Sequence, residues 1–246
     1  MAYKKITLEK RGAIGKITLN RPEVLNAMDV ELLTELAAAL NELDKDDSVN
    51  VAILMGAGRA FSAGRDIKAI RDGRGHPGLK WYKALEDFSK PVIAAVHGYC
   101  FTGAVEMLTY ADIVIASEDA VFSDTHARFG LIPGGGQTQR LPRQIGPRKA
   151  KELMFTSDRI SAIEAERIGF INKVVPTGKL EEAATEMAEK ILQNVPESIK
   201  ALKYLVNEGL KTDLESGVRM EAEIRERAKS VEEERNKRIN GIFKKK

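Results

Sequence analysis

The sequence of 246 residues contains one cysteine, Cys100, and three histidines at unrelated spacings. A single cysteine excludes an intramolecular disulfide, and so few histidines form no zinc-binding pattern, so we expect no metal site. No apolar run approaches the roughly 20 residues that a membrane-spanning helix needs. The first residues also lack the apolar centre of a signal peptide. We therefore expect a cytoplasmic protein without a membrane partner.

Motifs of two large enzyme classes are missing as well. There is no G-x-S-x-G, the nucleophile motif of the common serine hydrolases, and no G-x-x-x-x-G-K-[ST], the phosphate-binding loop of many nucleotide-binding proteins. The net charge is +3, and acidic and basic residues are interspersed except at the lysine-rich end, residues 244–246. This distribution argues against a nucleic-acid partner, because nucleic-acid-binding proteins concentrate basic residues on one face.

The composition, 43% hydrophobic and 30% charged, is that of a globular protein. The length fits one large domain of roughly 200 residues with an appendage. We place the boundary between residues 1–190 and residues 191–246. The second part is predicted to be helical, and its last helix is expected over residues 213–237.

Two segments of the first part share one order of elements: a buried strand, a glycine turn and a helix. The apolar run at 51–55 precedes the turn at Gly64, and the run at 92–96 precedes the turn at Gly103. Ligands of α/β proteins usually bind where the carboxyl ends of parallel strands meet. We expect both turns to open at that edge and to present free backbone N–H groups. Residues 71–78 are polar and glycine-rich and are expected to form a mobile loop.

Glu106 is the first candidate for chemistry, because it lies one turn into an otherwise apolar helix after Gly103. A carboxylate there could also serve only to stabilise the helix dipole. Two N–H groups from the two glycine turns, converging on one oxygen, would form an oxyanion hole that stabilises charge developing on a thioester. The glycine-rich loop at 133–136 fits a tight packing turn as well as a substrate loop.

Four ordered segments resemble the enoyl-CoA hydratase/isomerase (crotonase) family. They are NRP at 20–22 with LNAM at 25–28, FSAGRDI at 61–67, PVIAAVHGY at 91–99, and IPGGG at 132–136 with TQRL at 138–141. The resemblance covers nearly the whole chain and is more specific for the family than for one reaction. It implies an α/β crotonase fold, a spiral of ββα units followed by a helical C-terminal trimerisation region. It also implies a homotrimer or a homohexamer.

The resemblance assigns roles to residues that match the family's motifs. It implies oxyanion donors at the backbone N–H groups of Arg65 and Gly103, and an acid/base role for Glu106. The Arg65 side chain itself is expected to be exposed or near a phosphate. The residues implied to contact substrate and coenzyme A are Val24, Leu25, Ala63, Arg65, Asp66, Ile67, Lys68 and Gly103, with Lys237 reaching the coenzyme A of a neighbouring subunit.

One position departs from the family pattern. Hydratases of this kind have a second catalytic glutamate twenty residues after the first, and this chain has His126 there. Histidine can act as an acid or a base near neutral pH. The second group is therefore His126, Asp124 or none, and the bend that contains them could instead be purely structural.

The expected function is addition of water to an α,β-unsaturated acyl-CoA, which gives a 3-hydroxyacyl-CoA. No metal or redox cofactor is expected, since coenzyme A arrives as part of the acyl-CoA substrate. The alternatives are another crotonase reaction (isomerase, thioester hydrolase or decarboxylase) and a non-catalytic acyl-CoA-binding protein. A basic RNA-associated protein is the least favoured reading.

Overall fold

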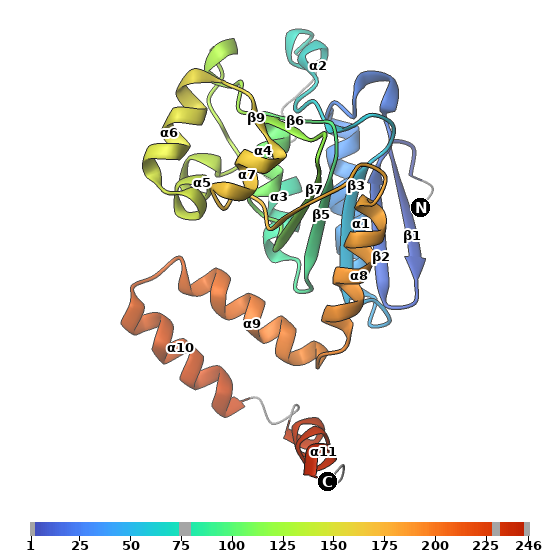
Figure 1. Cartoon of the computed structure of the whole chain (residues 1–246), viewed down its shortest axis with the longest axis vertical. Coiled ribbons are helices and arrows are strands. Elements are labelled where there is room, and N and C mark those ends of the chain that lie inside the picture. Colours follow the sequence, from blue (N-terminus) through green and yellow to red (C-terminus); the bar gives the residue numbers. More distant parts are fainter. Residues whose placement is uncertain (1–2, 74–79, 228–231, 244–246) are drawn as a thin grey trace.

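The computed structural model describes residues 3–73, 80–227 and 232–243. Its larger sheet has six strands in the order β1-β2-β3-β5-β7-β10 (Figure 1). Strands β1 and β2 are antiparallel, and every other neighbouring pair is parallel. The strands are β1 (Ile6–Arg11), β2 (Ile14–Leu19), β3 (Val51–Gly56), β5 (Val92–Val96), β7 (Ile113–Ser117) and β10 (Lys173–Val175).

The smaller sheet has the order β4-β6-β8-β9, with β4, β6 and β8 parallel and β9 antiparallel to β8. Its strands are β4 (Ala60–Ser62), β6 (Tyr99–Phe101), β8 (Val121–Ser123) and β9 (Ile160–Ser161). Each successive pair (β3 and β4, β5 and β6, β7 and β8) places one strand in each sheet before the chain turns into a helix. This repetition is the spiral of ββα units that the family resemblance implied.

The helices pack around and beyond these sheets. They are α1 (Val30–Lys45), α2 (Ile67–Arg71), α3 (Lys80–Asp87), α4 (Gly103–Leu108), α5 (Gln137–Ile145), α6 (Pro147–Thr156), α7 (Ala162–Arg167), α8 (Leu180–Leu192), α9 (Pro196–Gly209), α10 (Leu214–Arg227) and α11 (Glu232–Phe243), with short 3-10 helices η1 (Pro22–Val24) and η2 (Ala127–Phe129). Helix α1 follows Asp29, whose carboxylate caps the helix by accepting a hydrogen bond from Leu32 N at 2.9 Å.

The continuous apolar runs reflect burial of the larger sheet on both faces. Along β3, Ala52 and Leu54 face the main core, whereas Val51 and Ile53 pack with the apolar face of α8. Side chains on a strand alternate between faces, so a strand covered on both sides is apolar at every position. The prediction of buried strands at 51–55 and 92–96 is confirmed.

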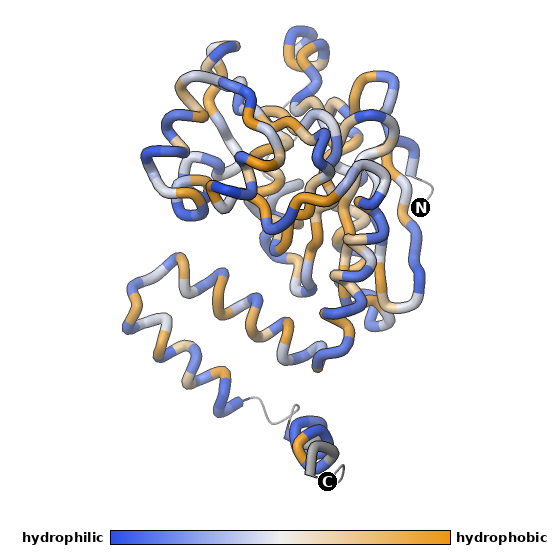
Figure 2. The backbone as a smooth tube through the Cα atoms, viewed as in Figure 1, coloured by the Kyte–Doolittle hydropathy of each residue, from blue (hydrophilic) through white to orange (hydrophobic). Residues whose placement is uncertain are grey.

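The C-terminal helices α9, α10 and α11 lie away from the sheets (Figure 1). Helices α9 and α10 contain no buried residue, although apolar residues recur along both of them (Figure 2). Of the helix expected over 213–237, α10 covers residues 214–227 and α11 begins at residue 232, and residues 228–231 lie outside the described part of the chain. The predicted domain boundary falls in the last turn of α8 and stays a prediction. Residues 74–78 of the expected loop at 71–78, and the lysine-rich end at 244–246, lie outside the described residues.

Candidate active site

The two glycine turns are in direct contact. Strands β4 and β6 pair with Ser62 opposite Cys100, so the residues that follow them run side by side. A Cβ atom on Gly64 would lie 2.6 Å from Phe101 O and 3.3 Å from Gly103 N. Gly64 also has a φ of +89°, which favours glycine. Only glycine at this position lets the turns approach so closely.

The backbone N–H groups of Arg65 and Gly103 are unengaged. Met28 N donates to Gly64 O at 2.7 Å, and Asp66 N donates to Met28 O at 3.0 Å. Arg65 lies between these two bonds in a parallel bridge, so its own N–H points away from Met28. Within the described part of the chain, no acceptor binds either N–H. Both remain free for a ligand oxygen.

Thr102 holds the second turn in an unusual backbone conformation, with φ 53° and ψ −109°. A β-branched residue rarely adopts a positive φ, and the cost is sustained only where neighbours fix the chain. Here Thr102 N donates to Ser123 O at 2.8 Å, and the Thr102 hydroxyl is hydrogen-bonded to that of Thr125. These contacts orient the peptide that carries the Gly103 N–H. Nothing in the sequence indicated this role for Thr102.

Glu106 lies one helical turn after Gly103 and is 5% exposed. Its Oε1 accepts hydrogen bonds from Gly135 N at 2.5 Å and, more weakly, from Gln137 N at 3.4 Å. Burial raises the pKa of the Glu106 carboxyl, while the Gly135 N–H and nearby His126 oppose the shift. Its Oε2 accepts no hydrogen bond from a described residue. One oxygen is thus held, and the other is available to a reacting group.

His126 and Asp124 form a buried pair beside Glu106. His126 Nδ1 lies 2.5 Å from Asp124 Oδ1, and Asp124 Oδ2 accepts a hydrogen bond from Gln137 Nε2 at 2.7 Å. This arrangement leaves Nε2 as the ring nitrogen that no described residue binds. The bend that contains Asp124 and His126 is therefore hydrogen-bonded, as expected if its role is structural. It also brings the imidazole close enough to influence the pKa of Glu106.

Gln137 is a site residue that the sequence did not reveal. It is fully buried, its backbone N–H reaches Glu106, and its side-chain amide holds Asp124. Its Oε1 is buried, and no described residue forms a hydrogen bond with it. The only signal in the sequence was its position directly after a glycine-rich loop at the start of a helix, where N–H groups are free. The loop at 133–136 is thus more than a packing turn, since it supplies a hydrogen bond to Glu106.

The residues implied to contact coenzyme A fall into two groups. Leu25 lies beside the first turn, because Ala63 N donates to Leu25 O at 2.8 Å. Val24, Ile67 and Lys68 have exposed side chains near this turn. The Asp66 carboxylate has other partners, since it caps α2 and forms an ion pair with Arg21 at 3.0 Å.

Lys237 is not brought to these residues. It lies in α11, which Figure 1 shows at the opposite end of the molecule from α2. Its predicted contact is with a neighbouring subunit's coenzyme A, and this stays a prediction.

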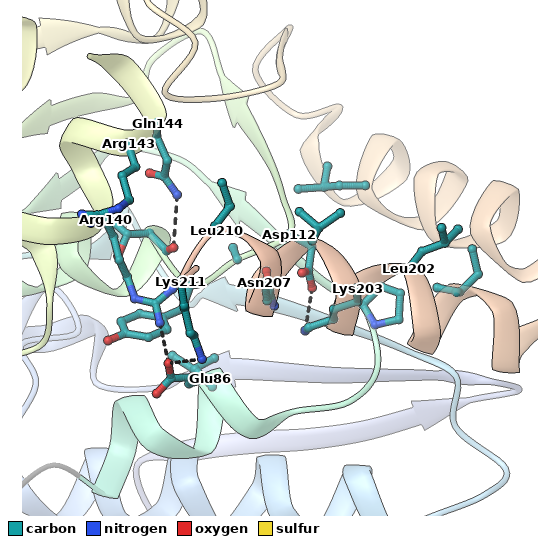
Figure 3. A pocket seen from close by; sticks show the side chains of 18 of the residues that line it. Glu86, Asp112, Arg140, Arg143, Gln144, Leu202, Lys203, Asn207, Leu210 and Lys211 are labelled. Atoms are coloured by element: carbon teal, nitrogen blue, oxygen red, sulfur yellow. Dashed lines mark hydrogen bonds and ion pairs between the residues drawn. The ribbon is translucent and has the colours of Figure 1, made fainter. Parts of the chain in front are cut away.

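A cavity of about 780 Å³ lies elsewhere, between α9 and the body of the protein. We call it the α9 cavity (Figure 3). Two ion pairs connect this helix to the body of the protein. Lys203, on α9, pairs with Asp112 at 2.8 Å, and Lys211, just after the end of α9, pairs with Glu86 at 3.1 Å. Tyr110 lines this cavity, and its hydroxyl donates to Gly135 O at 2.6 Å, in the loop that binds Glu106. Neither Arg65, Gly103, Glu106 nor His126 lines it.

Two further features are absent from the described residues. No group of three or more His, Cys, Asp or Glu side chains there is arranged to hold a metal ion. No helix in the same part of the chain combines the length and apolar character needed to cross a bilayer.

The chain is similar to known enoyl-CoA hydratases. The profile of the enoyl-CoA hydratase/isomerase family matches residues 9–244. The chain is 38% identical to the short-chain-enoyl-CoA hydratase of Clostridium acetobutylicum, covering 100% of this chain and 97% of the relative. It is 37% identical to the crotonyl-CoA hydratase of Syntrophomonas wolfei, covering 91% and 89%.

A solved structure shows the same fold. The crystal structure of an enoyl-CoA hydratase from Bacillus anthracis superposes with a TM-score of 0.92 at 35% identity, covering 99% of this chain and 97% of that one. The chain therefore belongs to the enoyl-CoA hydratase/isomerase family.

Proposed function

We propose that this protein is an enoyl-CoA hydratase that adds water across the double bond of a short α,β-unsaturated acyl-CoA. The observation that carries the proposal is the juxtaposition of two unengaged N–H groups, those of Arg65 and Gly103, with a buried carboxylate one helical turn further on. Two relatives are named as short-chain-enoyl-CoA and crotonyl-CoA hydratases, which supports the same reaction and a short acyl chain.

In the proposed mechanism, the thioester oxygen accepts hydrogen bonds from both N–H groups. The oxygen of water bonds to the β-carbon, and the electron pair of the double bond moves toward the thioester to give an enolate. The two donors stabilise the negative charge on its oxygen. Glu106 Oε2 takes a proton from the water, and a proton is delivered to the α-carbon, so the net change is addition of water. Coenzyme A enters with the substrate, and the proposal requires no metal or redox cofactor.

Mixing the purified protein with crotonyl-CoA tests this proposal, because hydration removes the absorbance of the conjugated thioester. A series of longer enoyl-CoA thioesters would give the preferred chain length. Binding of acyl-CoA without turnover across the series would favour a non-catalytic binding protein. Conversion to a non-conjugated product or release of free coenzyme A would favour the isomerase or hydrolase alternatives.

The Asp124–His126 pair is proposed as the second acid/base group, in place of the missing glutamate. Replacing His126 with Ala should lower kcat for hydration by on the order of 10²-fold, because its free Nε2 would no longer transfer a proton. Asp124→Asn should give a smaller loss and move the pH profile of kcat, since the carboxylate fixes the ring's tautomer. Steady-state rates across pH measure both effects.

His97→Asn is a matched control for this experiment, because His97 hydrogen-bonds Gly58 O and is not part of the pair. Unchanged turnover in His126→Ala would remove the histidine from the mechanism and leave Glu106 to act alone.

We also propose that the protein assembles as a homotrimer or homohexamer through its C-terminal helices. Exposed apolar residues recur along them, and Leu214 at the start of α10 is 84% exposed in the single chain. Leu214→Arg should therefore convert the assembly to smaller species, as measured by light scattering. Glu189→Arg, on the exposed face of α8, is the control. A monomeric wild-type protein would refute the assembly.

We also propose that the protein is cytoplasmic, as expected from the sequence. The free, fully buried thiol of Cys100 is compatible with it.

A further inference from the structure

The side chain of Arg65 is only partly exposed to solvent. It is half-buried, and its aliphatic stem lies over the second glycine turn. A Cβ atom on Gly103 would be 3.4 Å from Arg65 Cγ and 3.8 Å from Arg65 Cδ. The side chain is therefore half-buried rather than fully exposed, and the alternative expectation, proximity to a phosphate, stays a prediction. Arg65 supplies one of the two free N–H groups, and its side chain places a positive charge across the turn that supplies the other, the N–H of Gly103.

This guanidinium lacks an ionic or hydrogen-bonding partner among the described residues. Its Nε is fully buried and unpartnered. Arg21, by contrast, pairs with Asp29 and Asp66. A buried donor left without an acceptor costs free energy, so an orphaned guanidinium beside a candidate active site needs an explanation.

The two carboxylates that act on Arg65 electrostatically are Glu106 and Asp66. Glu106 holds Gly135 N through Oε1, and Asp66 holds Arg21 and Ala69 N. Burial lowers the pKa of the Arg65 guanidinium, although an arginine stays charged at neutral pH. The charge is therefore present and uncompensated by a hydrogen-bonded partner.

We propose that the Arg65 guanidinium binds a carboxylate on the acyl chain of the substrate, so that the preferred substrates are enoyl-CoA thioesters that carry a second acidic group. This inference rests on the proposed hydratase function. The planar fork of arginine matches a carboxylate with two parallel hydrogen bonds, and such charge-assisted bonds are stronger than neutral ones.

The position of Arg65 favours the acyl chain over coenzyme A as the source of the anion. In the proposed complex the thioester oxygen lies at the N–H groups of Arg65 and Gly103, and the Arg65 stem covers Gly103. Groups near the thioester carbon are therefore within reach of the guanidinium. The phosphates of coenzyme A share the anionic oxygen chemistry, but they lie at the far end of the pantetheine arm.

The test compares glutaconyl-CoA, which has a terminal carboxylate, with trans-2-pentenoyl-CoA, which has the same chain length and a methyl group there. Wild-type protein should show the higher kcat/KM with glutaconyl-CoA. Arg65→Gln keeps the backbone N–H and removes the charge, and should lower the ratio of the two kcat/KM values by about ten- to a hundred-fold. Arg65→Lys, which keeps the charge without the fork, should give an intermediate ratio.

Arg148→Gln is the matched control, because it removes one positive charge from an exposed position on α6. Its ratio should equal that of the wild type. The dissociation constant of free coenzyme A, measured by calorimetry, separates the two sources of the anion. An unchanged ratio in Arg65→Gln overturns the proposal, and so does an equal loss of affinity for both thioesters and for free coenzyme A.

The selectivity can also be read without turnover. Saturated glutaryl-CoA and pentanoyl-CoA would be compared by calorimetry in the wild type and in Arg65→Gln. If no enoyl thioester is hydrated, the hydratase function fails, yet a charge-dependent preference for glutaryl-CoA still supports carboxylate binding. If hydration proceeds with no such preference, only the carboxylate site is refuted.

Discussion

Replacing Glu106 with Gln should lower kcat for hydration of crotonyl-CoA by on the order of 10³-fold. The variant keeps the shape of the side chain, and its Oε1 can still accept the hydrogen bond from Gly135 N, but it cannot take a proton from water. The initial rate of absorbance loss measures the effect. Glu189→Gln, an exposed glutamate on α8, should retain the wild-type rate.

Thermal unfolding shows whether the Glu106→Gln loss is chemical or structural. Burial raises the pKa of the Glu106 carboxyl above its ordinary value of 4.5, so the native state binds this proton more readily than the unfolded state. The ionised carboxylate therefore destabilises the native state as pH rises above the unfolded pKa, with the full cost above the raised pKa.

Glutamine carries no such cost. Glu106→Gln should have a higher Tm than the wild type at pH 7, by about 2–4 °C for each kcal/mol relieved, and the difference should vanish as the pH falls below 4.5. An inactive variant that is also less stable at pH 7 would indicate structural damage, and full activity would remove Glu106 from the mechanism.

Gly135→Ala should lower kcat by about 10²- to 10³-fold while the protein stays folded. The added Cβ would lie 2.7 Å from Glu106 Cδ and 3.0 Å from both carboxylate oxygens. The carboxylate is the end of a flexible side chain, so it should move away from the added methyl group rather than force the backbone apart. The general base would then be misplaced relative to the attacking water. Steady-state kinetics and circular dichroism together measure the two parts of this prediction.

Gly209→Ala is the control, since nothing lies within 4 Å of the Cβ that would be added there. It should be fully active. A Gly135→Ala variant with wild-type kcat would mean that Glu106 does not need its present position, and a variant that fails to fold would place the strain in the loop itself.

The sequence predicted features that depend on local pattern. Apolar runs such as 51–55 and 92–96 reveal strands buried on both faces, because this signal is confined to a few neighbouring residues. The glycines at 64 and 103 were recognisable as turns for the same reason. The family resemblance then supplied the pairing of these turns, which no local pattern contains.

Features that depend on contacts between distant residues were not predictable in this way. The position of the Arg65 side chain is set by Gly103, 38 positions later, and Gln137 is defined by its bonds to Glu106 and Asp124. The pairing of Asp124 with His126 depends on the bend that brings the ring back onto the carboxylate. Charge and hydropathy along the chain carry no trace of such arrangements.

The pairing of β4 with β6 has a consequence for how this protein can change over evolution. Because Gly64 and Thr102 follow neighbouring parallel strands, the gap between the Arg65 and Gly103 amides derives from an inter-strand spacing of about 4.8 Å. Substitutions at the acyl end, including at Arg65 itself, leave that gap intact. A lineage can therefore exchange one acyl group for another by altering side chains, while a one-residue slip between these strands would abolish every such variant at once.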